Sequence, residues 1–241
     1  MRKSLAILAA ALLSGCVTPV SLPGPELPPA ANAGPGVAEP LAAETAARNF
    51  LSVASAMEPV IERECSARNR QAGCDFQIVV DDRPNQPANA FQTLDRAGRP
   101  VIAFTLALIA DARNADELAF VMGHEAAHHI LSHIPKSQEQ AMVGALLLGT
   151  IASLGGGSAA SVEAAQKVGA SVGARRFSKG FELEADQLGT VIAWDAGFDP
   201  ERGAQFFDRL ADPGDSFLGT HPPNADRKAV VRATLAGLRG F

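Results

Sequence analysis

The chain of 241 residues contains no tyrosine, one tryptophan and three cysteines. No phenol hydroxyl can therefore donate a hydrogen bond at any site. Histidine is also scarce: four of the five fall between His124 and His133, and the fifth is His221. Basic residues number 21 against 26 acidic ones, and the net charge of −5 argues against nucleic acid as a partner. We find no internal repeat and no sign of a second domain.

The first sixteen residues have the pattern of an export signal. Arg2 and Lys3 precede a short apolar run, and small residues precede Cys16. The run is far shorter than the roughly 20 residues of a transmembrane helix. The four residues ending at Cys16 resemble a bacterial lipobox, which implies a lipoprotein signal peptide over residues 1–15 and a lipid on Cys16. An ordinary signal peptide with an incidental cysteine is the alternative.

The residues that follow Cys16 predict a membrane-tethered domain. Valine rather than aspartate at position 17 favours, by the same resemblance, an outer-membrane lipoprotein facing the periplasm. Residues 16–40 are rich in proline, alanine and glycine and are expected to form an extended tether to a domain over 41–241. In an exported protein, Cys65 and Cys74 are expected to form a disulfide, with two free thiols as the alternative.

Residues 124–128 read His-Glu-Ala-Ala-His, which is the most informative feature of the chain. In a helix, a spacing of four residues corresponds to about 400° of rotation and a rise of roughly 6 Å. Both imidazoles can therefore reach one zinc ion, and Glu125 can hold a water molecule on it. The alternative is that the pattern arose by chance in an alanine-rich helix. We expect one Zn²⁺ per chain, bound by His124 and His128.

The residues around this motif predict a helix. Asn114 is a favourable N-cap, acidic residues fill the first turn, and Pro135 is expected to end the helix near Ile134. Gly123 lies just before the first histidine and lowers helix propensity, but its missing side chain would let a neighbouring backbone come close to the metal.

Glu182 is the best candidate for a third zinc ligand. Glu182 and Asp186 are four residues apart and share a helical face, so Asp186 could accept a hydrogen bond from a ligand histidine. Glu184 is expected to face the other way. His129 and His133 are poorly placed on the helix, and His133 is expected to be a partly exposed structural residue. For Glu182, a solvated acidic face is the alternative.

Three segments together resemble the gluzincin metallopeptidases of the HtpX and CAAX-prenyl-endopeptidase type. They are His-Glu-Ala-Ala-His, the segment Glu182–Gly189 and His221-Pro222, and the resemblance covers roughly residues 45–230. It implies an α+β, mainly helical zincin domain with a small antiparallel sheet before the zinc helix. It also implies Glu182 as third ligand and Asp186 behind a histidine. Without transmembrane helices, the chain looks like the periplasmic lipoprotein branch.

The expected chemistry is hydrolysis of a peptide bond. Zinc lowers the pKa of its water, and Glu125 would take the proton and pass it to the leaving amine. Because tyrosine is absent, His221 is the candidate donor to the oxyanion. It could instead occupy the fourth zinc position as a gate, or be a plain loop histidine. Arg227 follows six residues later and is expected beside the ligands.

Two further segments bear on substrates and partners. Residues 141–162 carry no charge, so they could form a buried core helix, a lid or a membrane contact. Phe76–Val80, Ala90–Thr93 and Pro100–Thr105 are predicted strands, and the last could be a sheet edge that pairs with an extended peptide.

Taken together, these features predict a zinc endopeptidase of the cell envelope. It would degrade misfolded or unassembled envelope proteins and contact the outer-membrane protein assembly machinery. The alternative is a chaperone-like assembly factor for outer-membrane proteins with little proteolysis.

Overall fold

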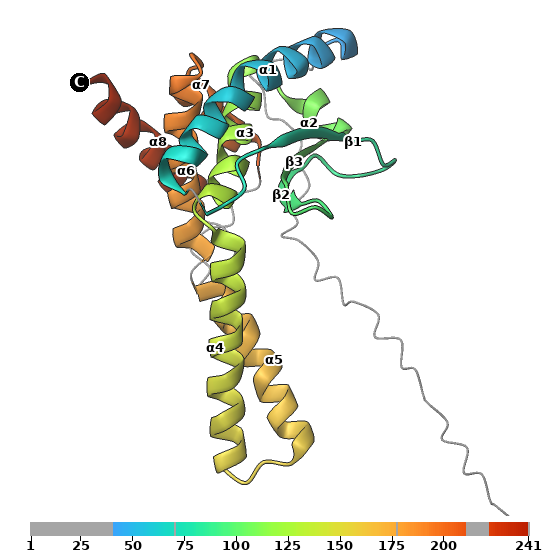
Figure 1. Ribbon diagram of the computed structural model, residues 1–241, viewed down its shortest axis with the longest axis vertical. Helices are drawn as coiled ribbons and strands as arrows, with labels where there is room; N and C mark the ends of the chain where they lie inside the picture. The colour runs from blue at the N-terminus through green and yellow to red at the C-terminus, as the bar shows by residue number, and fades with distance from the viewer. Residues whose placement is uncertain (1–40, 70, 177, 211–221, 241) are drawn as a thin grey trace, which may run out of the picture.

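The computed structural model describes residues 41–69, 71–176, 178–210 and 222–240 (Figure 1). The predicted signal peptide and tether, with Cys16, lie outside these residues, and so does His221. The elements are α1 (Ala43–Arg68), β1 (Gln77–Asp81), β2 (Ala90–Leu94), β3 (Pro100–Thr105), α2 (Leu106–Asp111), α3 (Ala115–Ile130), α4 (His133–Leu154), α5 (Ala159–Arg176), α6 (Ser178–Asp195), α7 (Pro200–Gly203), the 3₁₀ helix η1 (Ala204–Arg209) and α8 (Asn224–Arg239). The expected α+β, mainly helical fold is confirmed.

The sheet differs from the expectation in the place of one strand. Its order is β1-β3-β2, and β3 pairs antiparallel with β2 but parallel with β1. The sheet is therefore mixed rather than antiparallel, and the interpretation of Pro100–Thr105 as an edge strand is wrong. Five of the six residues of β3 are buried, as suits a strand with a neighbour on each side. The two edges of this sheet are β1 and β2.

The core lies where α1 and α3 pack together. α1 contributes Phe50, Met57 and Ile61, and α3 contributes Leu118 and Phe120, all of them buried. A disulfide between Cys65 and Cys74 joins the end of α1 to the segment before β1, with the two Cα atoms 5.7 Å apart. This packing holds α3, the helix with the His-Glu-Ala-Ala-His motif, in the middle of the domain (Figure 1).

α3 is shorter than expected because the helix ends at Ile130, and the chain changes direction before α4. Asn114 caps the start of the helix as predicted, accepting a hydrogen bond from the Glu117 amide. At the other end, Ser132 adopts a left-handed conformation with φ of 57°, and α4 begins at the next residue. Pro135 would clash with the carbonyl of the residue four before it in a continuous helix, but it fits the first turn of a new one.

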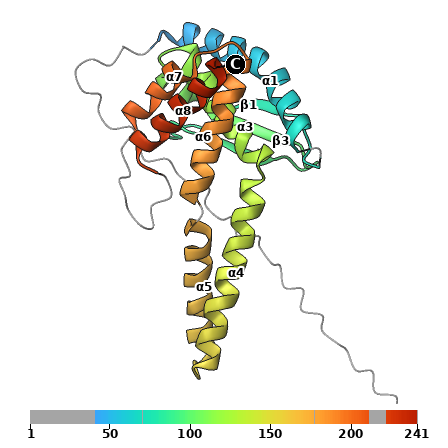
Figure 2. The same cartoon turned by 90° about the vertical axis from the view of Figure 1, so that its left-hand side faces the viewer.

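α4 and α5 form an antiparallel hairpin that projects from the rest of the domain (Figures 1 and 2). The two helices touch through glycines: a Cβ built on Gly144 would lie 2.1 Å from the carbonyl oxygen of Gly169. Only His133 and Gly149 of α4 are buried, so the interpretation of residues 141–162 as a core helix is wrong. No helix in the described parts of the chain is long and apolar enough to cross a membrane.

Candidate metal centre

The candidate metal centre lies where α3 crosses α6. A Cβ on Gly123 would lie 2.8 Å from the carbonyl oxygen of Gly189, and one on Gly189 would lie 2.8 Å from the amide nitrogen of His124. The glycine pair lets the two backbones approach closely. The close neighbour expected at Gly123 is therefore α6, the helix that carries Glu182 and Asp186.

Three side chains from these helices point their donor atoms at one another. The Nε2 atoms of His124 and His128 are 3.1 Å apart. The carboxylate of Glu182 lies 3.5 Å from Nε2 of His124 and 3.4 Å from Nε2 of His128. Two ligands of a tetrahedral zinc ion, each bound at about 2.0–2.1 Å, lie roughly 3.3 Å apart. The triangle therefore has the size that one zinc ion requires.

The charges around this triangle favour a cation. Burial alone would lower the pKa of the His124 imidazole, but hydrogen bonds to Asp186 and Glu182 raise it to about 10. Carboxylates that stabilise a proton at this position would also offset the charge of a divalent ion. Among the described residues, one group of histidine, cysteine, aspartate or glutamate side chains lies close enough together to bind one ion. It consists of His124, His128 and Glu182. Three protein ligands leave the fourth position for water, as in catalytic zinc sites.

Behind His124 lies a buried ion pair. Oδ1 of Asp186 is 2.9 Å from Nδ1 of His124, and the Arg227 guanidinium donates to both carboxylate oxygens of Asp186. Burial would raise the pKa of the Asp186 carboxyl, but the charge and hydrogen bonds of Arg227 hold it below its usual value. An Asp186 carboxylate that accepts the Nδ1 proton of His124 leaves Nε2 free to bind a metal. The structure thus brings Asp186 and Arg227 to the place expected for them.

Behind His128 lies a second chain of side chains that differs from the expectation. Nδ1 of His133 is 3.0 Å from Nδ1 of His128, and its Nε2 is 3.3 Å from a carboxylate oxygen of Glu184. The His133 ring is 3% exposed and stacks on Phe181. The expectation of a partly exposed His133 is therefore wrong. Glu184 is exposed and lies outside the ligand triangle, but its contact with His133 was not expected. The break at Ser132 turns His133 back toward the centre, which the spacing in one continuous helix could not reveal.

The hydrogen-bond roles in this second chain follow from the state of His133. Burial and the neighbouring His128 lower the pKa of the His133 imidazole to about 3, so the ring is neutral. A neutral ring has one donor and one acceptor nitrogen. With Nδ1 accepting from His128, Nε2 donates to Glu184, and this arrangement leaves Nε2 of His128 facing the triangle.

Glu125 and His129 lie on α3 on either side of His128 in the sequence and have different surroundings. Glu125 is partly exposed, and burial raises the pKa of its carboxyl, although His124 and His128 lower it. A higher pKa makes the carboxylate a better proton acceptor. His129 instead has Nε2 2.8 Å from the carbonyl oxygen of Gly73 and contacts Gln92 of β2. It therefore ties the disulfide-bonded loop and the sheet to α3 and stays outside the ligand triangle.

A cavity of about 450 Å³ opens beside His128. Gly73 and Gln92 form one wall, from the disulfide-bonded loop and the edge strand β2, and Leu94 and Ile134 provide apolar surface. Leu94 is 54% exposed and Ile134 43%, so this surface is open to solvent. The cavity adjoins a candidate metal ligand and can accommodate a side chain.

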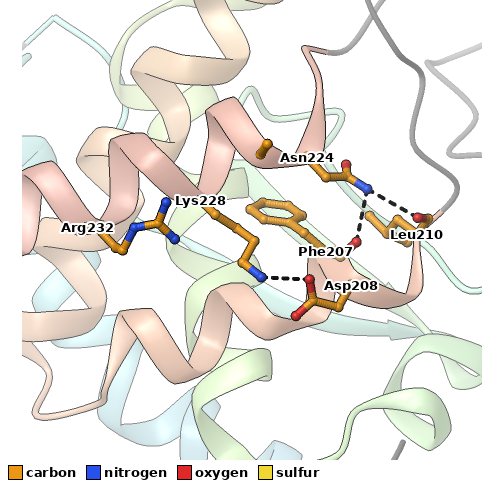
Figure 3. Close-up of a pocket in the computed structure, with 7 residues that line it drawn as sticks. Phe207, Asp208, Leu210, Asn224, Lys228 and Arg232 are labelled. Carbon is orange, nitrogen blue, oxygen red and sulfur yellow. Dashed lines mark hydrogen bonds and ion pairs between the residues drawn. The ribbon is translucent and has the colours of Figure 1, made fainter. Parts of the chain in front are cut away.

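A second cavity, of about 460 Å³, lies between η1 and α8 (Figure 3). Asn224 of α8 lines this cavity and donates hydrogen bonds to the carbonyl oxygens of Phe207 and Leu210, at 3.0 and 3.2 Å. Leu210 is the last described residue before residues 211–221, which include His221. The role of His221 as donor or gate stays a prediction.

Comparisons with known proteins agree with this geometry. The model of peptidase family M48 matches residues 47–235. The chain is 34% identical over 142 residues to a Vibrio cholerae protein named "Putative beta-barrel assembly-enhancing protease", covering 52% of this chain and 29% of that protein. It is 31% identical over 135 residues to the beta-barrel assembly-enhancing protease of Yersinia pestis, covering 49% and 27%. It is 25% identical over 170 residues to the mitochondrial metalloendopeptidase OMA1 of Arabidopsis thaliana, covering 69% and 33%. The matched segments thus span a third or less of each relative's length.

Proposed function

The chain belongs to peptidase family M48, and on that basis we propose that it is a zinc-dependent endopeptidase of the bacterial cell envelope. The observation that carries the proposal is the triangle formed by His124, His128 and Glu182, whose edges of 3.1 to 3.5 Å suit one zinc ion. The partly exposed Glu125 between the two histidines is the residue that a purely structural zinc site would not need.

The residues of the site divide the work of peptide hydrolysis. His124, His128 and Glu182 would hold the ion, which would supply an acidified water and polarise the peptide carbonyl. Glu125 is placed to accept a proton from an attacking water and to return it to the leaving amine. Asp186 and His133 fix the orientation of the two ligand histidines from behind. His221 remains the candidate donor to the oxyanion, since the chain has no tyrosine.

Substrates are proposed to bind as extended segments along β2. This strand is a sheet edge, and its Gln92 is linked to α3 through His129, so it runs beside the metal centre. Pairing with a strand edge recognises backbone amides more than side chains. The cavity beside His128 then receives one substrate side chain. Such recognition suits misfolded or unassembled proteins, whose backbones are exposed. The two bacterial relatives are named as β-barrel assembly-enhancing proteases, so we propose that unassembled β-barrel proteins are among the substrates.

The proposed location is the periplasmic face of the outer membrane, through a lipid on Cys16. The lipobox-like residues before Cys16 and the valine at position 17 support it. The same location would bring the domain to the outer-membrane protein assembly machinery. Mass spectrometry of the membrane-extracted protein should show an acylated N-terminus at Cys16.

Degradation of a β-barrel outer-membrane protein tests the function. The purified zinc-loaded chain should degrade the barrel protein when it is kept unfolded and should spare the same protein folded in detergent. Glu125→Gln should lose this activity, whereas Glu139→Gln, which changes an exposed carboxylate on α4, should keep it. Equal degradation by wild type and Glu125→Gln would contradict the proposal. Binding of the unfolded barrel without cleavage would instead indicate a chaperone-like assembly factor.

A further inference from the structure

The outer face of α4 is apolar along its distal half. Its side chains are between 56% and 85% exposed, and they are Met142, Val143, Leu146, Leu147, Ile151 and Leu154. At 100° per residue, these positions cover about half of the helix circumference. Gly144 and Gly149 lie on the other side, where each approaches a residue of α5. We call the six exposed side chains the α4 face.

In the part of the chain that the structure describes, no other element packs against the α4 face. The hairpin extends beyond the other elements, so in the described residues nothing but solvent faces its distal half (Figures 1 and 2). Soluble proteins rarely expose a continuous apolar patch of this extent, and such patches mark sites of contact with proteins or membranes.

The other helix of the hairpin has a different character. Glu163 and Lys167 of α5 form an ion pair, and their side chains are 65% and 76% exposed. Val168 and Val172 are exposed on another flank of α5, so the helix has both an apolar and a charged side. The hairpin therefore combines one broadly apolar helix with one that has a charged side. The apolar helix could therefore contact lipid while the ion pair of α5 stays in water.

The charge of the hairpin fits an anionic lipid surface. Residues 133–176 contain four basic residues, Lys136, Lys167, Arg175 and Arg176, and two acidic ones, Glu139 and Glu163. The segment thus carries a net charge of +2, while the whole chain carries −5. Lys136 lies in the first turn of α4, and Arg175 and Arg176 lie in the last turn of α5, so this charge is at the end of the hairpin nearest the domain. It therefore attracts the hairpin toward anionic headgroups from a distance, and the contact itself depends on the α4 face.

The chain that precedes the domain would hold the hairpin within reach of a bilayer. Residues 17–40, between the predicted lipid on Cys16 and the domain, can span at most about 80 Å. α4, with 22 residues, is roughly 33 Å long. A domain on such a tether meets the membrane surface continually, which favours a bilayer over a soluble protein as the occupant of the α4 face.

From these observations we infer that the α4 face docks on the surface of a phospholipid bilayer, with the charged side of α5 toward water. The hairpin connects α3, which carries His124 and His128, with α6, which carries Glu182. Docking would therefore orient the candidate metal centre relative to the membrane. The inference needs neither zinc nor catalysis, so it can fail while the proposed peptidase function stands.

Fluorescence quenching by brominated lipid tests the inference. The natural tryptophan is first removed by Trp194→Phe in the full chain, and a single reporter is introduced by Leu147→Trp on the α4 face. The protein is bound to vesicles of phosphatidylethanolamine and phosphatidylglycerol, with or without bromine on the acyl chains. Bromine should quench the reporter at position 147 at least twofold. It should leave Lys167→Trp, on the charged side of α5, nearly unchanged.

The controls test whether the variants fold normally and whether the quenching depends on the α4 face. Both reporter positions are exposed, so thermal unfolding of the variants should match that of the Trp194→Phe parent. Adding Leu146→Glu and Ile151→Glu should abolish the quenching at position 147 while the lipid anchor still holds the protein on the vesicles. Equal quenching at positions 147 and 167, or none at either, would overturn the inference. Crosslinking of position 147 to a second copy or to another protein, without quenching, would also overturn it.

Discussion

Arg227 and Asp186 form a buried ion pair in which both carboxylate oxygens accept a hydrogen bond of 2.7 Å. Arg227 is 4% exposed and Asp186 is fully buried. The same carboxylate contacts Nδ1 of His124, so α8 is connected through α6 to a candidate ligand on α3. The C-terminal helix is thereby coupled to the metal centre.

Arg227→Met should destabilise the fold and weaken zinc binding together. Removing one partner of a buried ion pair leaves an uncompensated charge, which costs about 3–5 kcal/mol. Loss of support behind a ligand histidine lowers metal affinity about 10–100-fold. Arg232→Met, on an exposed position of the same helix, is the control and should change neither. Chemical denaturation and competition with a zinc chelator measure the two effects, and unchanged zinc affinity in the folded variant would contradict this coupling.

Glu182→Ala should lose zinc, and Glu184→Ala should retain it. Glu182 is part of the ligand triangle, whereas Glu184 contacts the outer nitrogen of His133, at 3.3 Å, and is half exposed. Metal analysis of both variants after dialysis gives the answer. Zinc retained in Glu182→Ala but lost in Glu184→Ala would reverse the assignment.

His133→Phe should lower zinc affinity about 10–100-fold without a large loss of stability. The phenylalanine ring keeps the stacking on Phe181 but cannot accept the Nδ1 proton of His128. Chelator competition measures the affinity, and thermal unfolding of the metal-free protein checks the fold. An affinity equal to that of wild type would mean that His133 only fills space.

Gly189→Ala should destabilise the chain and weaken zinc binding, although alanine favours a helix. The added methyl group would lie 2.8 Å from the His124 amide nitrogen and push α6 away from α3. Overpacking of this kind costs about 1–3 kcal/mol. Gly180→Ala on the same helix meets nothing within 4 Å and should stabilise by about 0.5–1 kcal/mol. Equal stability and equal zinc affinity of the two variants would show that the helix crossing does not depend on Gly189.

Local spacing in the sequence predicted the parts of the site that depend on one helix turn. His124 and His128 are four residues apart, as are Glu182 and Asp186, so helical geometry alone places each pair on one face. The N-cap at Asn114 was predicted for the same reason, because it depends on neighbouring residues only. That the two pairs meet was inferred from the need for a third ligand and for an acceptor behind a ligand histidine, and the family resemblance implied the same.

The features that were not predicted depend on contacts between distant residues or on a change of helix direction. The parallel pairing of β1 with β3 joins residues 24 positions apart, such as Gln77 and Val101, which no local pattern reveals. Pro135 was interpreted as the end of one helix, although it equally suits the first turn of the next. That choice hid the contact between His133 and His128. A charge-free segment such as residues 141–162 looks the same whether it is buried or exposed.

Titration of the metal-free chain with zinc tests the central claim most directly, with cleavage of an unfolded β-barrel protein measured at each point. The account predicts no cleavage without metal and a rate that reaches its plateau at about one zinc per chain. Glu125→Gln should bind the same amount of zinc and cleave at least about 100-fold more slowly, because an amide cannot accept the proton of the water. Cleavage by the metal-free chain, or undiminished cleavage by zinc-loaded Glu125→Gln, would contradict it.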